Sequence, residues 1–464
     1  MTRKKCVKLG QTTWKMAARC ALPIVIIIPV LVSLMVAQTG GRGFDTARDP
    51  GVRAGTGISG EALDGLTAPQ LAAFTGGLET FKEVSSVDGS VADEPDGGLG
   101  PSFNMTSCGG CHAFPAVGGS SPPLNPQVAA ATANGGRNIV PSFITSDGPI
   151  REVRFKRHAD GRPDGGVHAL FVITERFDAP SGCDLRQTDF AEQVRRGNAV
   201  FRIPTPLFGA GLIEAIPDST ILTSAAADAR RKDQFGIHGR PNRTDHDGSI
   251  TRFGWKAQNA SLLVFAGEAY AVEQGITNDL FPQPRESGTG CVVSEEHEDH
   301  MDFVTGEAGD LEAFVHFMRL LAPPAPVTEY GTVSAASIQR GLAAFNNVGC
   351  AFCHTERMTT GRSYIDALND KEIRLFSDLL LHNMGTRLAD GISQGVADGD
   401  EFRTAPLWGL GQRIFFLHDG RTKDLLEAIR IHASDGSEAN QSIRAFEYLS
   451  DTLKQDLLNF LRSL

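Results

Sequence analysis

Much of the organisation of this chain follows from the stretch Ser107-Cys108-Gly109-Gly110-Cys111-His112, which Gly349-Cys350-Ala351-Phe352-Cys353-His354 repeats. Each contains C-x-x-C-H, the spacing at which two thiols bond to a haem and the next histidine binds its iron. A zinc knuckle would need a second pair of ligands nearby, and neither stretch has one. A thioredoxin-like dithiol needs no such histidine. The pattern therefore predicts two covalently bound c-type haems, with His112 and His354 as iron ligands.

The second axial ligand of each iron decides its chemistry. A six-coordinate haem transfers electrons, whereas an open or releasable position can activate peroxide or oxygen. For the C-terminal haem, His432 is well placed after a predicted helix over 422–431, although a histidine that contacts solvent or a propionate is the alternative. The other candidates for this ligand are His382, Met384 and His418.

The N-terminal haem has no histidine soon after its motif. The next histidines are distant: His158, His168, His238 and His246. Either one of these closes the sixth position or the iron is open, and the sequence leaves both possibilities standing.

Composition and charge restrict the class of protein. The chain has 464 residues, 41% hydrophobic and 21% charged, which is typical of a globular protein with more than one domain. The formal net charge is −11, and residues 1–37 contain six basic and no acidic residues, so the remainder carries −11 − 6 = −17. An acidic surface repels nucleic acid and favours a basic electron-carrier protein, although it also simply keeps a protein in solution.

The N-terminus has the layout of an export signal. Residues 1–19 are basic and residues 21–37 are apolar, so residues 1–37 are predicted to be a cleaved signal peptide or a membrane anchor. Either alternative exports the bulk of the protein to the periplasm, with membrane contact only through an uncleaved segment. Outside the leader and the two motifs only Cys183 and Cys291 remain, and in an exported protein they form either one disulfide or two buried free thiols.

Hydrophobic periodicity predicts two helix-bounded units. Helices are expected after the N-cap Thr67 and over 310–321, 334–345 and 454–464, and strands over 151–155 and 167–177. Each C-x-x-C-H motif thus has a helix before it and a closing helix after it. The expected fold is mainly α, with two c-type cytochrome-like domains in tandem, the first enlarged by loop- and β-containing insertions. The predicted segments are a linker at 38–66, an N-terminal haem domain at 67–325 and a C-terminal cytochrome c-like domain at 326–464.

Peroxide chemistry also needs an acid–base group beside an open iron, to move a proton between the two oxygens. Glu214, in an apolar context, and Glu273, at a helix end, are candidates, and the alternative for each is a structural or surface carboxylate. Trp255 is a candidate relay between the haems, although a tryptophan is more often simply part of the core.

At this point the chain resembles the bacterial di-haem oxidoreductases, and more distantly the di-haem cytochrome c peroxidases and the di-haem enzyme that matures methylamine dehydrogenase. The blocks that carry the resemblance are RDPGVR, SCGGCHAFPAVGGSSPPLNPQVA, FRIPTPLFGAGLIEAIPD, RFGWKAQNASL, VGCAFCHTERM, LLLHNMG, EFRTAPLWGLG and FLHDGRTKDLLEAIRIH. It implies Trp255 as the relay, Glu273 as the acid–base group and His432 as the sixth ligand, where the peroxidases usually have Met. Gln274 also replaces a usual Met, and the histidine that those peroxidases release is missing. A calcium ion between the haem domains is known in the peroxidases, and no secure ligands for one can be named here.

Two classes of function follow. The first is a peroxidase that reduces hydrogen peroxide, or another small oxidant, with electrons from a donor protein such as a small cytochrome or a cupredoxin. The second is a non-catalytic electron-transfer protein with both irons six-coordinate. Oxidation of a protein or organic substrate is a further possibility within the enzyme class. A high-spin iron separates the enzyme from the carrier.

Overall fold

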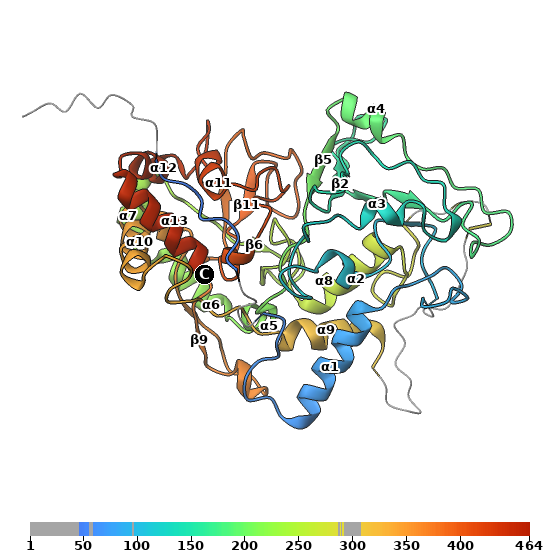
Figure 1. Cartoon of the computed structure of the whole chain (residues 1–464), viewed down its shortest axis with the longest axis horizontal. Coiled ribbons are helices and arrows are strands. Elements are labelled where there is room, and N and C mark those ends of the chain that lie inside the picture. Colours follow the sequence, from blue (N-terminus) through green and yellow to red (C-terminus); the bar gives the residue numbers. More distant parts are fainter. Residues whose placement is uncertain (1–45, 55–58, 95–96, 286–287, 289, 292–307) are drawn as a thin grey trace, which may run out of the picture. The chain divides into compact units, whose positions relative to one another are not determined.

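The computed structural model describes residues 46–54, 59–94, 97–285, 288, 290–291 and 308–464 (Figure 1). The predicted leader and the first part of the predicted linker lie outside these residues. Helical residues (32%) outweigh strand residues (13%), which confirms the mainly α class. None of the described helices is both long and apolar enough to cross a membrane.

The helices in chain order are α1 (Ala68–Lys82), α2 (Cys108–Cys111), α3 (Gln127–Ala130), α4 (Phe190–Arg195), α5 (Ala210–Glu214), α6 (Asp218–Ala226), α7 (Ala229–Phe235), α8 (Leu262–Ala269), α9 (Asp310–Leu320), α10 (Ala335–Asn347), α11 (Leu425–Ile431), α12 (Asn440–Glu447) and α13 (Asp451–Ser463). A π-helical turn, η2 (Tyr270–Gln274), continues α8, and η3 (Cys350–Phe352) is a 3₁₀ turn.

The strands are short: β1 (Ser102–Phe103), β2 (Glu152–Phe155), β3 (Val167–His168), β4 (Phe171–Val172), β5 (Ala199–Arg202), β6 (Asn242–Arg243), β7 (Ile250–Thr251), β8 (Met358–Thr359), β9 (Glu372–Ile373), β10 (Leu381–Asn383) and β11 (Glu401–Arg403). They pair antiparallel, as one three-stranded sheet in the order β3-β2-β5 and as the pairs β1-β4, β6-β7, β8-β9 and β10-β11. The single strand predicted over 167–177 is two strands, because β3 pairs with β2 whereas β4 pairs with β1. Between them the Leu170 N–H donates to Asn104 Oδ1.

The first helix pair consists of α1 and α9, which pack together (Figure 1). Thr67 and Gln70 form a reciprocal capping box that starts α1 as the sequence predicts. Gly77 lies at the crossing, where a Cβ would collide with the Ala313 carbonyl oxygen. Below it the rings of Phe81 and Phe317 lie 4.8 Å apart, and burying each ring contributes roughly 1.5–3 kcal/mol.

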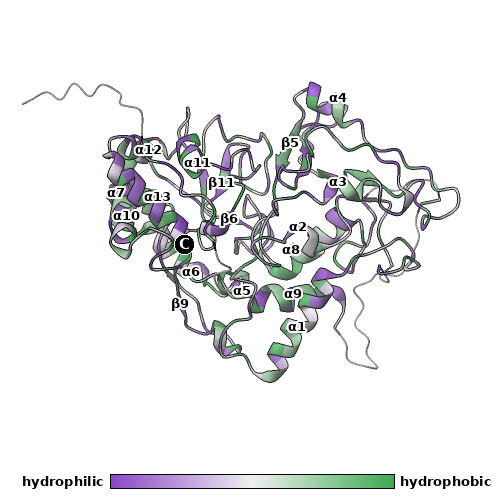
Figure 2. Cartoon of the chain, in the orientation of Figure 1, coloured by the Kyte–Doolittle hydropathy of each residue, from purple (hydrophilic) through white to green (hydrophobic). Residues whose placement is uncertain are grey.

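The second pair, α10 and α13, repeats this arrangement. Ser334 caps α10 by accepting from the Ser337 N–H. At the crossing a Cβ on Gly341 would collide with the Asp456 carbonyl oxygen, and the rings of Phe345 and Phe460 lie 5.4 Å apart. Hydrophilic and hydrophobic colours mix along α1 and α13 (Figure 2), as expected for helices with one buried face.

Residues of the predicted linker lie against the C-terminal helices. Asp49 forms an ion pair with Arg462 of α13 at 2.6 Å and accepts from the Leu425 N–H, and Ala47 joins the core around α10 and α13. The predicted boundary at 325/326 is also crossed by a buried ion cluster, in which Asp390 binds Arg202 at 2.8 Å and Lys256 at 3.2 Å. The segments that carry the two motifs therefore share buried charge as well as apolar contacts.

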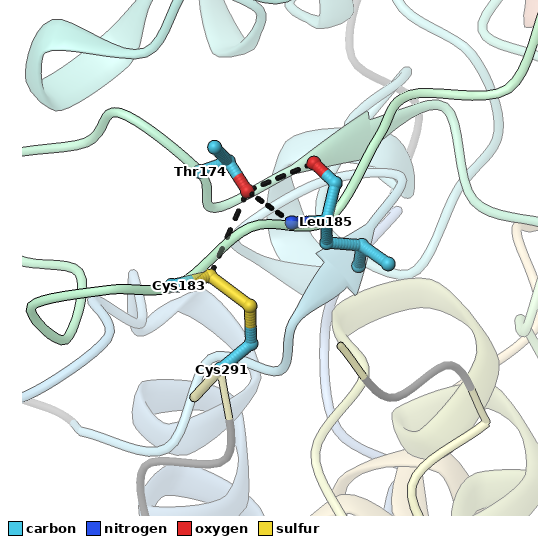
Figure 3. The surroundings of a disulfide bond; sticks show 4 residues. All are labelled: Thr174, Cys183, Leu185 and Cys291. Carbon is cyan, nitrogen blue, oxygen red and sulfur yellow. Dashed lines mark hydrogen bonds between the residues drawn. A yellow bond between two sulfur atoms is a disulfide. The ribbon is translucent and has the colours of Figure 1, made fainter. Parts of the chain in front are cut away.

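Cys183 and Cys291 form a disulfide (Figure 3), the first of the two alternatives that the sequence left open. Beside it Thr174 Oγ1 donates to the Leu185 carbonyl oxygen and accepts from the Leu185 N–H, both at 2.9 Å. The four motif cysteines form no disulfide with another described residue.

Candidate functional site

Around the C-terminal motif lies a cavity with an empty volume of about 1370 Å³. Gly349, at φ +89°, turns the chain from α10 into η3, so that Cys350, Cys353 and His354 all line the cavity. Most other lining residues are apolar and come from α11, α12 and α13 and from the loop that follows β11. A large apolar chamber with two thiols and an imidazole on one wall has the chemistry that a c-type haem requires.

His354 has one ring nitrogen engaged and the other available. Its Nδ1 lies 3.0 Å from the Phe376 carbonyl oxygen, which fixes the proton on Nδ1. Burial lowers the pKa of His354 to about 4, so the ring is neutral at physiological pH. The lone pair on Nε2 is therefore free to bind a metal.

His432 has the same arrangement at the C-terminus of α11. Its Nδ1 lies 2.7 Å from the Ala428 carbonyl oxygen, and burial lowers its pKa. His432 lines the same cavity as His354. A positive charge on His432 would lower the pKa of His354 further. The cavity thus has two neutral imidazoles that could each present Nε2 to one iron.

The other candidates for this ligand differ in how far they are engaged. His382 has both ring nitrogens bound, Nε2 to Asp378 at 2.9 Å and Nδ1 to Glu438 at 2.7 Å, so no lone pair remains. Burial acts to lower the pKa of His382, but Cys353 and Asp378 outweigh burial and raise it well above its usual value. His418 also lines the cavity but stacks on Phe402 at 4.3 Å.

The N-terminal motif opens into a second cavity, with an empty volume of about 960 Å³. The helix α2 carries Cys108 and Cys111, and the His112 Nδ1 lies 3.1 Å from the Gly119 carbonyl oxygen. Burial lowers the pKa of His112 to about 4. His112 therefore repeats the arrangement of His354, and the Phe81 ring lies 5.9 Å from it as Phe345 lies 6.3 Å from His354.

Among the described residues that line the N-terminal cavity, His112 is the only histidine. His158 and His168 both contact Asp164 instead, at 3.3 and 2.9 Å, and His238 and His246 are exposed. The structure therefore brings none of the four distant candidates to this cavity. Met105 is the one lining side chain with a thioether sulfur.

Two carboxyl groups, Glu152 and Glu273, line the N-terminal cavity. Glu273, in the π-turn η2, accepts from Asn104 Nδ2 at 2.9 Å and forms a hydrogen bond with Glu152 of β2. Burial raises the pKa of Glu273 well above its usual value, and the neighbouring Glu152 carboxylate adds to this. Burial also acts to raise the pKa of Glu152, but Arg154 and Arg202 outweigh burial and lower it.

Glu214 lies outside both cavities. It binds Arg319 at 2.8 Å and accepts from the Leu262 N–H at 2.9 Å. These contacts are those of a structural carboxylate, the alternative that the sequence left open for Glu214.

Trp255 lines both cavities. Its Nε1–H donates to the Ile203 carbonyl oxygen at 2.9 Å, and its ring lies edge-on to His418 at 6.4 Å. The side chain is 8% exposed and held in one orientation, so it forms part of the wall between the chambers.

Two arginines that the sequence did not single out as site residues, Arg403, which is buried, and Arg413, which is partly buried, line the C-terminal cavity. Burial lowers the pKa of Arg413 to about 10, and burial together with Arg413 lowers that of Arg403 to about 10. Arg403 donates to the carbonyl oxygens of Gly254 and Thr404, and neither guanidinium forms an ion pair with another described residue. Unpaired guanidinium groups in an apolar chamber suit the two carboxylates of a haem. The residues present therefore fit the group that the motifs imply.

The sequence over residues 157–464 matches the family described as di-haem oxidoreductase, putative peroxidase. The chain belongs to this family. The residues before 157, which include the N-terminal motif, α1 and β2, lie outside the match. Among curated proteins, none matches the sequence of this di-haem oxidoreductase.

Three solved structures are similar to this di-haem oxidoreductase at low identity. Hydrazine synthase of Kuenenia stuttgartiensis is 19% identical over 35% of this chain, with a TM-score of 0.23, and the match spans 58% of its own length. A MauG-like protein associated with microbial copper homeostasis is 17% identical over 57% of this chain and 91% of its own, with a TM-score of 0.28. The diheme peroxidase BthA of Burkholderia thailandensis is 14% identical over 58% of this chain and 88% of its own, with a TM-score of 0.28.

The calcium ion that the resemblance implied remains a prediction for this di-haem oxidoreductase. Among the residues that the structure describes, no group of three or more His, Cys, Asp or Glu side chains is placed to hold a metal ion.

Proposed function

We propose that this di-haem oxidoreductase is an exported, periplasmic peroxidase that reduces hydrogen peroxide with electrons from a donor protein. One observation carries the proposal. His354 and His432 line the C-terminal cavity, each with its Nδ1 near a backbone carbonyl and its Nε2 available, whereas among the described residues the N-terminal cavity is lined by one histidine and a pair of carboxyl groups. A closed iron suits electron transfer, and an iron with a free position beside an acid suits peroxide.

The residues take distinct roles in this proposal. Cys350 and Cys353 would attach the C-terminal haem, and His354 and His432 would bind its iron. Cys108 and Cys111 would attach the N-terminal haem, and His112 would bind its iron. When bound, the haems supply the electrons that break the peroxide O–O bond.

Two side chains of the protein serve the transfer of electrons and of a proton. Trp255 forms the wall that electrons cross from the C-terminal to the N-terminal chamber, since it borders both. Glu273, buried in the N-terminal chamber, provides the proton for the departing oxygen. A basic small cytochrome or a cupredoxin is the expected donor, because the chain after residue 37 carries a net charge of −17, from −11 − 6.

A single observation favours a second candidate, the non-catalytic electron carrier. Met105 lines the N-terminal cavity, and a Cβ on Gly110 of the motif would lie 3.4 Å from the Met105 Cε. A thioether in this cavity could serve as a sixth ligand, which would leave both irons closed.

Low-temperature electron paramagnetic resonance on the purified holoprotein tests the proposal. The spectrum is recorded fully oxidised, after ascorbate, and after addition of peroxide. One high-spin iron per chain that changes with peroxide supports the peroxidase. Two low-spin signals that persist through half-reduction and do not respond to peroxide would make the protein a carrier.

A further inference from the structure

The N-terminal cavity contains two neighbouring carboxyl groups, Glu273 and Glu152. The proposed function gives a role to Glu273 and none to Glu152. Glu152 lies on β2, five residues before the family match begins at residue 157. A hydrogen bond joins Glu152 to Glu273. Two carboxylates repel each other, so a hydrogen bond between them requires that one of the two carries a proton.

The groups around each carboxyl decide where that proton resides. Arg154 Nε binds Glu152 Oε1 at 2.6 Å, and Arg202 faces Glu152 across the β2–β5 pair. Two guanidinium groups stabilise the ionised form of Glu152. Asn104 donates to Glu273, and Glu268 of α8, whose Oε2 accepts from Asn259 Nδ2 at 2.5 Å, lines the same cavity.

Glu273 is held by a neutral neighbour. The Asn104 Oδ1 accepts from the Leu170 N–H at 2.9 Å, which turns the Asn104 amide group toward Glu273 Oε2. With Oε2 accepting this hydrogen bond, the other oxygen of Glu273 is left to carry the proton. Burial away from any directly paired cation favours the neutral acid at this position.

We propose that Glu152 and Glu273 share one proton and act as a single acid–base pair on peroxide bound in the N-terminal cavity, with Glu273 as the donor and the Glu152 carboxylate as the acceptor. This rests on the proposed peroxidase function and adds Glu152 as a catalytic residue. Arg154 is a positioning residue, because it holds Glu152 ionised.

The carboxyl pair gains one proton from peroxide and gives one proton back, so its own proton count does not change. The hydrogen on the inner peroxide oxygen passes to Glu152, and the Glu273 proton passes to the outer oxygen as the O–O bond breaks. The outer oxygen leaves as water with its own hydrogen and that of Glu273, and the two electrons come from the haems. The pair still holds one proton, which returns to Glu273 through the shared hydrogen bond. The inner oxygen leaves as the second water after two protons from solvent, and the donor protein returns two electrons.

The test compares Glu152→Gln, Glu152→Asp and Glu273→Gln with Glu214→Gln, a structural carboxylate outside both cavities. The haem absorption spectrum first establishes that each variant holds both haems. Infrared difference spectra between neutral and alkaline buffer then report the carbonyl stretch of a protonated carboxyl group. Wild type and Glu214→Gln should show this band, Glu273→Gln should lose it, and Glu152→Gln should keep it at a shifted frequency.

The rate of the first peroxide turnover provides the second measurement. Glu152→Gln should be slower by about 10²–10⁴-fold, the usual size of general acid–base catalysis, with KM little changed. Glu152→Asp should recover part of the rate, and Glu214→Gln should match wild type.

The outcomes separate the two claims. If the wild type does not turn over peroxide, the proposed function is overturned, and the role of the acid–base pair with it, whatever the infrared bands show. A wild type that turns over peroxide, with Glu152→Gln equal to it in rate and band frequency, overturns only the role of Glu152. A carboxyl band that survives in Glu273→Gln overturns the assignment of the proton.

Discussion

The two C-x-x-C-H units share a frame and differ in what faces the histidine. In both, a leading helix crosses a closing helix at a glycine, Gly77 or Gly341, and four residues later a phenylalanine packs on the closing helix and beside the motif histidine. In both, the Nδ1 of that histidine lies within hydrogen-bonding distance of a backbone carbonyl. The rest of the lining differs, however, because His432 lines the C-terminal cavity and the carboxyl groups of Glu152 and Glu273 line the N-terminal cavity.

This difference teaches that the shared helix crossing and motif determine only the surroundings of the motif histidine. The helix crossing and the motif repeat because they are local in sequence and held by the same close packing. His432 and the two carboxyl groups come from elements that the two units do not share. His432 ends α11 in one unit, and the carboxyl groups are in β2 and η2 in the other. In the proposed function, the same helix crossing and motif would serve electron transfer in the C-terminal unit and peroxide chemistry in the N-terminal unit.

The largest expected effect comes from removing each pair of thiols. Replacing both Cys108 and Cys111 by Ser should leave one covalent haem per chain and abolish peroxide turnover, because the N-terminal haem can no longer be attached. Haem content by pyridine haemochrome and haem staining after denaturing electrophoresis measure this. The matched variant, with Cys350 and Cys353 replaced, should also retain one haem but keep the high-spin signal. Identical spectra from the two variants would contradict the difference between the units.

The second largest effect is expected on the spin state of the C-terminal haem iron. His432→Ala should turn the C-terminal haem from low spin to high spin, because the second imidazole at that iron is removed. Electron paramagnetic resonance measures the change, and His418→Ala is the control, since His418 stacks on Phe402 in the same cavity. Conversion in the His418 variant with an unchanged His432 variant would transfer the ligand role to His418.

A smaller effect is expected at the wall between the units. Trp255→Phe should slow electron transfer between the haems about tenfold, a barrier change of about 1.4 kcal/mol, because the smaller ring leaves a gap and loses the hydrogen bond to Ile203. Stopped-flow reduction of the N-terminal haem through the C-terminal one measures the rate. Trp408→Phe is the control, since Trp408 is as buried as Trp255, at 9% against 8%, but lines neither haem cavity. Equal slowing in both variants would mean a general packing effect.

Local sequence signals predicted the frame well. The cysteine spacing located both motifs, the capping residues Thr67 and Ser334 marked the starts of α1 and α10, and periodicity located α9 and α13. These features depend on residues within a few positions of one another. The residues alone made Trp255 and Glu273 candidates, the resemblance favoured both, and both line the N-terminal cavity.

The side chains of β2 that line the N-terminal cavity could not be predicted in the same way. Glu152 and Arg154 alternate with apolar residues in the strand REVRF, a pattern typical of a strand with one face in water, yet their face borders the cavity. Which face of a strand meets a cavity depends on distant elements. One internal signal was available, because Phe201-Arg202 and Phe402-Arg403 each precede a Pro-Leu-aromatic-Gly turn. Arg202 and Arg403 line the N-terminal and the C-terminal cavity respectively.

The smallest effect tests the shared frame through stability. Gly77→Ala and Gly341→Ala should each destabilise the protein by about 1–3 kcal/mol, because a Cβ at either crossing meets backbone that cannot move away freely. Gly76→Ala is the matched control, since nothing lies within 4 Å of a Cβ there, and a helical Ala in place of Gly adds up to about 1 kcal/mol of stability. Denaturant unfolding followed by haem absorbance measures all three. Because the same collision occurs in both units, a loss at Gly341 without a loss at Gly77 would mean that the enlarged N-terminal unit absorbs strain that the C-terminal unit cannot.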